Sequence, residues 1–260
     1  MHRYWRRAAA MTVAIALFAA ASDVNHHEPA QYSTQRGDRY EAALPDSSVL
    51  VLNTDSEVLL NFTAATRNAE FNYGEVIFRI NPHDRRPFLL HQGDITLTTS
   101  DAVFSVRTLS QRALLLNVLS GSMVVHQAIF DLFHPFELEA HLIAKRSYHI
   151  NEGHLEIEPF SQASADCLWA WERGELCLFN QPLVVAVQEV NRYTRRRVII
   201  ADPTLNTLRV GGRFDIPALL PSFADALTKS LGIRYVVEDN TLVLLPPCDP
   251  SHHLPQPSSC

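Results

Sequence analysis

The sequence lacks the short motifs that mark common enzyme sites. It contains no GxSxG nucleophile motif, no Walker A phosphate loop and no GxGxxG dinucleotide loop. Its twelve histidines include a group interspersed with glutamates at positions 134–154, but their spacing matches no HExxH metal motif. We therefore expect a protein that is not an enzyme, with no catalytic residues, no cofactor and no metal site.

Positive charge is also scarce. Lysine and arginine number 22 against 28 acidic residues, which gives a formal net charge of −6. Neutralising phosphates requires a basic surface, so we do not expect a nucleic-acid binder. The basic clusters are short, and clusters of this size are usually solvated ends of elements. They are Arg6-Arg7, Arg85-Arg86 and Arg195-Arg196-Arg197.

The hydrophobic content is high enough for two small domains. The chain has 260 residues, of which 47% are hydrophobic and 19% charged. A chain of this length and composition can fill a core and exceeds one average domain.

Residues 1–22 predict an export segment. Arg6 and Arg7 precede Ala8–Ala21, a run without charge. A positive start before a short apolar run is typical of a cleaved secretory signal, and Ala19–Ala21 supplies small residues for cleavage. The same run also fits a short inner-membrane anchor with the two arginines in the cytoplasm. In both cases we expect the rest of the chain to be periplasmic, beginning with a linker at 23–35.

Four cysteines without a CxxC pair favour an oxidising compartment over a zinc ribbon or a thioredoxin-like site. Cys167 and Cys177 flank one short segment and are able to pair, as are Cys248 and Cys260 in the tail. Free thiols are the alternative in each case.

Residues 36–130 predict an all-β domain, a roll or sandwich. Short apolar runs alternate with turn residues, as in Glu75–Ile80, which is rich in β-branched and aromatic residues and is closed by Asn81-Pro82. No segment between 40 and 126 has a convincing helical period. Residues 131–168 are expected to form a connector with additional strands.

Residues 169–246 predict a compact α+β module. Apolar residues repeat at helical spacing in two segments, and short strands surround them. The expected order is β-α-β then β-α-β-β, with both helices on one sheet face. The segments are a strand at 176–179, a helix at 182–194 capped by Asn180, strands at 198–200 and 208–214, a helix at 217–231 ended by Gly232, and a hairpin at 233–245. Gly211-Gly212 suggests a bulge. The tail, 247–260, is expected to be disordered.

Two groups of residues together resemble the periplasmic part of the FecR family, regulators of iron-uptake signalling. In the β half they are Leu44-Pro45-Asp46, Tyr73–Phe78 and Arg86-Pro87-Phe88; in the last third they are Trp171–Leu176, Glu189–Tyr193, Asp202-Pro203 and Gly211–Phe214. The sequence departs from the family pattern at Ser47, where the family has glycine, and at Ser100-Asp101, where it has glycine-threonine.

The resemblance implies a mainly β protein: a FecR-type roll or sandwich followed by a module like the short N-terminal domain of secretins and TonB-dependent transporters. It also implies a sensor that relays by protein contact from the N-terminal signalling domain of an outer-membrane TonB-dependent transporter toward sigma-factor regulation. Family members begin with a cytoplasmic sigma-binding domain, for which only Met1–Arg7 is available here. That difference has three explanations: a protein that naturally lacks the domain, a start codon assigned too late, or a split gene. If the domain belongs to a separate sigma-regulating protein, that protein would be a second partner.

The resemblance and the residue pattern give seven candidate partner-binding residues. Trp169 and Trp171 either seal the joint between the two domains or anchor a partner. Arg192 and Tyr193 either form a solvated helix end or contact another protein. Leu208, Val210 and Phe214 belong to a strand that, like 241–245, either exposes a sheet edge to a partner strand or pairs internally.

Two other functions compete with the sensor. An exported envelope scaffold would use the same β domain without anti-sigma activity. A hydrolase of envelope polymers would need a cleft with converging carboxylates, which no motif supports.

Overall fold

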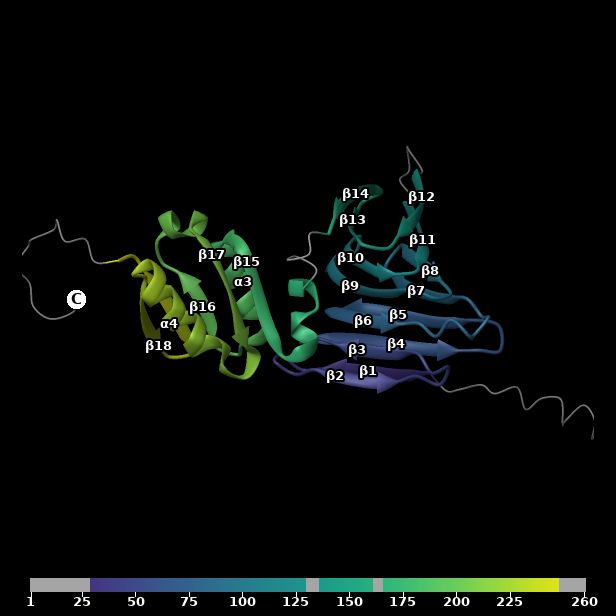
Figure 1. The fold of residues 1–260 in the computed structure, drawn as a ribbon, viewed down its shortest axis with the longest axis horizontal. Helices are drawn as coiled ribbons and strands as arrows, with labels where there is room; N and C mark the ends of the chain where they lie inside the picture. The colour runs from purple at the N-terminus through teal and green to yellow at the C-terminus, as the bar shows by residue number, and fades with distance from the viewer. Residues whose placement is uncertain (1–28, 130–135, 161–165, 248–260) are drawn as a thin grey trace, which may run out of the picture.

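The computed structural model describes residues 29–129, 136–160 and 166–247, and these form two lobes joined at one side (Figure 1). The first lobe is a sandwich of two seven-stranded sheets. The second is the smaller α+β module. Within these residues no helix is both long and apolar enough to cross a membrane. The export segment and the tail predicted from the sequence lie outside them.

The two sheets of the sandwich are almost entirely antiparallel; only β5 and β7 pair in parallel. The first sheet has the order β1-β4-β5-β7-β8-β11-β12 and comprises β1 (Ala30–Thr34), β4 (Ser56–Phe62), β5 (Arg67–Tyr73), β7 (Phe88–Gln92), β8 (Ile95–Thr99), β11 (Ser122–Ile129) and β12 (Phe136–Ile143). The second has the order β14-β13-β10-β9-β6-β3-β2 and comprises β14 (His154–Pro159), β13 (Arg146–Asn151), β10 (Ala113–Ser120), β9 (Val103–Ser110), β6 (Glu75–Arg79), β3 (Val49–Leu52) and β2 (Tyr40–Ala43).

The sandwich core follows from alternation along the strands. In β4 every second side chain, including Val58, Leu60 and Phe62, points into the core. Phe78 from one sheet meets Phe88 from the other with ring centroids 5.0 Å apart. Burying apolar and aromatic area between two sheets stabilises a sandwich.

One buried ion pair explains two of the FecR-like motifs. The Arg67 guanidinium is fully buried and donates to Asp46 Oδ2 at 2.7 Å and to the Arg86 carbonyl at 2.7 Å. The Leu-Pro-Asp turn and the Arg-Pro-Phe strand start therefore meet at one side chain. Ser47, in that turn, has φ of +65°, the left-handed conformation that favours glycine.

Two predicted boundaries change. β1 lies inside the predicted linker 23–35 and pairs with β4; the pattern missed it because only alternate residues of this edge strand are half-buried. β12, β13 and β14 lie inside the predicted connector but belong to the two sheets of the sandwich. The sandwich thus runs from Ala30 to Pro159.

The module contains two sheets instead of the one expected. β15 (Glu175–Pro182) pairs with β17 (Arg209–Asp215), and β19 (Thr241–Leu245) lies between β16 (Arg197–Ile200) and β18 (Arg234–Glu238). Helix α3 (Leu183–Tyr193) contacts β15 and β16, and α4 (Leu219–Leu231) contacts β17 and β18. Each helix therefore packs on both sheets. Three short 3-10 helices complete the module: η1 (Ala170–Arg173), η2 (Pro203–Thr207) and η3 (Ile216–Ala218).

Local signals in the module are mostly confirmed. Gly232 ends α4 with φ of +67°, donating its N–H to the Thr228 carbonyl. The register between β15 and β17 shifts between Leu178 and Gln181, opposite Gly211-Gly212. Asn180, predicted as a helix cap, instead has φ of +44° in this irregularity. The residue preceding α3 is Pro182.

Candidate partner-binding site

The joint between the lobes is apolar at its centre. Trp169 and Trp171 are buried in one cluster with Val51 of β3 and Ile77 of β6, which are both fully buried. The tryptophans therefore seal the domain joint, one of the two roles predicted for them, and their side chains are not on the free surface. Neither indole N–H has an acceptor among the described residues.

An ionic network surrounds this apolar centre. Arg192 Nη2 lies 2.8 Å from Glu75 Oε2, and Arg192 Nη1 lies 3.0 Å from Glu189 Oε2. Arg107 of β9 lies 2.8 Å from the other Glu189 oxygen. Burial alone would raise the pKa of Glu189, but Arg107 and Arg192 outweigh it and hold the pKa below its usual value. Burial likewise favours a lower pKa for Arg192, and Glu75 and Glu189 raise it instead.

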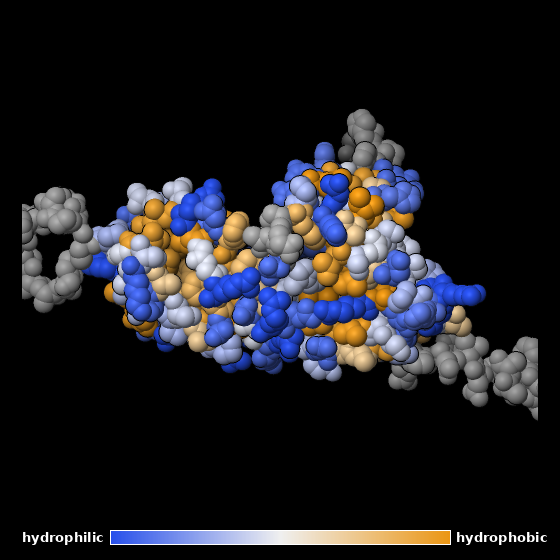
Figure 2. Space-filling model, in the orientation of Figure 1, coloured by the Kyte–Doolittle hydropathy of each residue, from blue (hydrophilic) through white to orange (hydrophobic). Residues whose placement is uncertain are grey.

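Helix α3 also carries neutral hydrogen bonds to the sandwich. Asn53 donates to the Tyr193 hydroxyl at 2.8 Å, and Thr54 Oγ1 donates to the Arg192 carbonyl at 3.0 Å. Burial, with Glu75 nearby, raises the pKa of Tyr193. Arg79 of β6 pairs with Glu172 of η1. Arg192 and Tyr193 thus bind the first lobe, a contact within the chain that the sequence interpretation did not foresee. In Figure 2 hydrophilic residues gather along this boundary.

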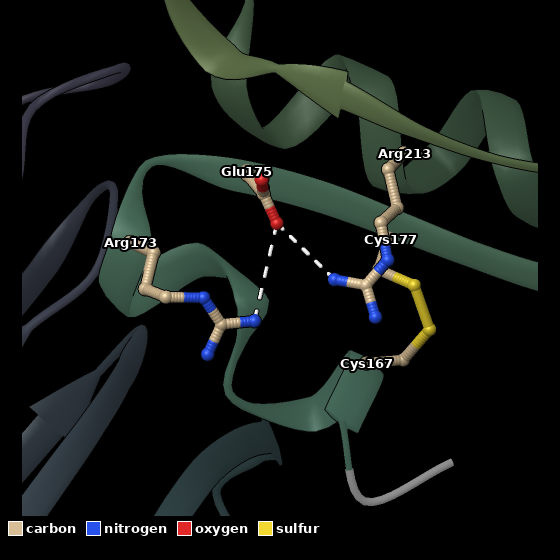
Figure 3. Close-up of a disulfide and its surroundings, with 5 residues drawn as sticks. All are labelled: Cys167, Arg173, Glu175, Cys177 and Arg213. Atoms are coloured by element: carbon tan, nitrogen blue, oxygen red, sulfur yellow. Dashed lines mark hydrogen bonds and ion pairs between the residues drawn. A yellow bond between two sulfur atoms is a disulfide. The ribbon is translucent and has the colours of Figure 1, made fainter. Parts of the chain in front are cut away.

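A disulfide fastens the entry to the module. Cys167 and Cys177 are bonded, as one of the two predicted alternatives has it, and tie the segment before η1 to β15 (Figure 3). Glu175 Oε2 lies 3.1 Å from Arg213 of β17 and 3.9 Å from Arg173 of η1. This carboxylate therefore connects the η1 end to both strands of the small sheet.

The predicted strand residues face inward. Leu208 is half-buried just before β17, and Val210 and Phe214 are buried within it. The Phe214 ring packs against Phe223 of α4 with centroids 5.6 Å apart. On its side away from β15, β17 pairs with no other described strand. Its main chain therefore forms a free sheet edge, as one of the two predicted alternatives has it. Its apolar side chains, in contrast, are packed inside the module.

Of the two alternatives predicted for 241–245, the structure shows internal pairing and not a free edge. β19 pairs with β16 in parallel on one side and with β18 antiparallel on the other. Its strong apolar character reflects this central position. The free edges of the three-stranded sheet are β16 and β18.

β18 carries the apolar surface that the sequence interpretation missed. Tyr235, Val236 and Val237 are 46%, 39% and 50% exposed. Across the sheet, Val236 lies beside Val243, and Val243 lies beside Ile199 of β16, which is also exposed. Figure 2 shows apolar surface at this far end of the module. The sequence does contain a feature that points to this surface. Tyr235, Val236 and Val237 form an aromatic and β-branched run in which apolar residues do not alternate with polar ones.

Titratable residues form no metal site in the part of the chain that the structure describes, since no three of its His, Cys, Asp and Glu residues are grouped to hold an ion. His134, part of the histidine group in the sequence, lies outside the described residues.

Comparisons with known proteins agree with this architecture. Residues 30–123 match the family described as FecR protein. Two crystal structures of a "putative anti-sigma factor" from Parabacteroides distasonis share the fold, with TM-scores of 0.67 and 0.66 at 21% identity, covering 84% and 85% of this chain and 100% of theirs. No curated protein matches the chain. The predicted FecR resemblance and mainly β fold are confirmed, and the fold similarity extends beyond the matched residues.

Proposed function

We propose, from the match of residues 30–123 to the FecR family, that this protein is the periplasmic sensor module of a FecR-type signalling system and regulates a sigma factor by protein contact. The observation that carries the proposal is the family match combined with a fold shared with the whole crystallised chain of a "putative anti-sigma factor". In this role the chain binds proteins and catalyses no reaction.

The partner on the outer side would be the N-terminal signalling domain of a TonB-dependent transporter, which links the system to iron uptake. The surface best suited to it is the β18 edge. An edge strand offers unpaired main-chain groups to a partner strand, and exposed apolar side chains add contact area. β18 combines both features through Tyr235, Val236 and Val237.

A binding experiment tests this surface. The full chain, purified in mild detergent, is titrated with the signalling domain of each TonB-dependent transporter of the same genome. One domain should bind, and Val237→Lys should weaken its binding by roughly tenfold or more, because a buried lysine at an interface centre is costly. The matched control is Ile157→Lys on β14, an edge strand of the sandwich, where the side chain is also 50% exposed.

Equal loss in both variants would exclude the β18 edge as the docking surface. Binding to none of the domains would exclude the transporter relay and favour an exported scaffold that uses the sandwich without signalling.

The route across the membrane has its own test. In a Gram-negative host the intact mass in the inner-membrane fraction would identify Ala8–Ala21 as an anchor. A soluble product shortened by about twenty residues, the length of a signal peptide, would show that this chain alone cannot carry a signal to the cytoplasm.

A further inference from the structure

A cleft of about 760 Å³ lies at the boundary of the two lobes, beside the ionic network. Residues from both lobes line it: Arg36, Thr54, Asp55, Tyr73, Gly74, Arg107 and Thr108 from the sandwich, and Gln188, Asn191, Arg192, Thr194, Arg195 and Arg197 from the module. Its volume lies within the range of small-molecule sites, roughly 300–1,000 Å³.

The lining is strongly basic although the protein is acidic. Five arginines line the cleft against one acidic residue, Asp55, while the whole chain carries a net charge of −6. Arg107 and Arg192 are already paired with glutamates in the ionic network. Arg36 is held only loosely, with its Nη2 atom 3.7 Å from Asp55 Oδ2.

Two of these arginines have no partner within the described residues. The side chains of Arg195 and Arg197 make no hydrogen bond or ion pair there, although their backbones are fixed by Asn240. Asn240 Nδ2 donates to the Arg195 carbonyl, and the Arg197 N–H donates to the Asn240 carbonyl. Two guanidinium groups are thus carried on a backbone that Asn240 fixes, and no acidic side chain among the described residues neutralises them.

Thr108 belongs to the wall of the same cleft on the side of the sandwich. Its hydroxyl oxygen is buried with no hydrogen-bond partner in the described structure.

We propose that this cleft binds a small multivalent anion that carries two or more phosphate or carboxylate groups. Guanidinium groups bind both anions through paired N–H donors, and such charge-assisted bonds are about twice as strong as neutral ones. Arg195 and Arg197 would hold the anion from the module, and Arg36 would hold it from the sandwich. The bound anion would therefore contact both lobes.

Calorimetric titration of the full chain tests the site, with inorganic pyrophosphate and the tricarboxylate tricarballylate as separate probes. The buffer contains about 150 mM NaCl, which screens long-range attraction between exposed charges. We expect saturable one-to-one binding of at least one probe, and the probe that binds identifies the anion class. The double variant Arg195→Gln/Arg197→Gln should weaken binding by roughly tenfold or more.

The matched control is Arg196→Gln. It removes one positive charge, against two in the double variant, from the residue between them, which does not line the cleft. It should bind the probe like the unmodified protein. Thermal unfolding without probe shows whether the double variant remains folded.

Three results would overturn the proposal. One is binding of neither probe. Another is an equal loss in Arg196→Gln, which would mean general attraction to a basic surface. A third arises if hexaglutamate, titrated in the same way, binds more tightly than either small probe, which would make the occupant an acidic peptide.

Discussion

Asn53, on the loop after β3, donates a hydrogen bond to the hydroxyl of Tyr193, the last residue of α3, at 2.8 Å. The two residues are 140 positions apart. The same Asn53 amide donates to Glu75, which also binds Arg192. The end of α3 is therefore attached to the sandwich by neutral and charged contacts that share atoms.

Replacing Tyr193 by phenylalanine tests the neutral contact. The change removes the acceptor of a buried hydrogen bond and keeps the ring, so we expect a loss of about 1 kcal/mol in unfolding free energy. Urea unfolding followed by tryptophan fluorescence measures it, since Trp169 and Trp171 lie at the joint. Tyr40→Phe, at an exposed tyrosine on β2, should change the midpoint little; a similar loss there would contradict the interpretation.

Stability should fall in acid because of Glu189. Its pKa lies below the usual value near 4.5 in the folded protein, so folding favours its charged form. That contribution is fully present above the unfolded pKa and is lost as pH falls through the folded value. Urea midpoints at pH 7, 5, 4 and 3 should show the loss below about pH 4.5.

The control for this pH dependence is Glu189→Gln, which should be less stable at pH 7 and lose less on acidification. A pH profile identical to that of the unmodified protein would show that Glu189 is not a source of the acid sensitivity.

Removing the disulfide should destabilise the module. The bond closes a loop between residues 10 positions apart, a size for which chain entropy gives about 2.5–3 kcal/mol. We expect Cys167→Ser/Cys177→Ser to lower the unfolding free energy by about that amount. Dithiothreitol should lower the original protein to the same level and leave the double variant unchanged. Sensitivity of the double variant to dithiothreitol would point to a different stabilising bond.

Ser47→Gly should stabilise the sandwich by up to about 1 kcal/mol. Ser47 has φ of +65°, and a side chain in this left-handed region costs about 1–2 kcal/mol, part of which the greater entropy of unfolded glycine offsets. Thermal unfolding measures the gain. The same change at Ser33, an exposed residue in β1, should destabilise instead, because glycine weakens a strand. Destabilisation at Ser47 would show that its side chain makes a needed contact.

The sequence by itself determined the class of each lobe and most element positions in the module. Alternating runs identified the strands of the sandwich, and helical spacing with Gly232 located α4. These features depend on neighbours within a few residues, where backbone propensity and side-chain periodicity are fully encoded. β1 escaped because an edge strand buries too little to produce that pattern.

Only the tertiary structure decided which residues form the surface. The sequence left Trp169 and Trp171 open between sealing the domain joint and anchoring a partner. Val51 and Ile77, more than 90 positions earlier, bury them at the joint. Val237 belongs to an apolar strand of the predicted hairpin, yet its side chain is 50% exposed on β18, at the edge of its sheet. Arg195 and Arg197 read as a solvated cluster until the sandwich forms the opposite wall of their cleft. Exposure depends on what packs against a residue from distant parts of the chain, and local pattern carries no record of it.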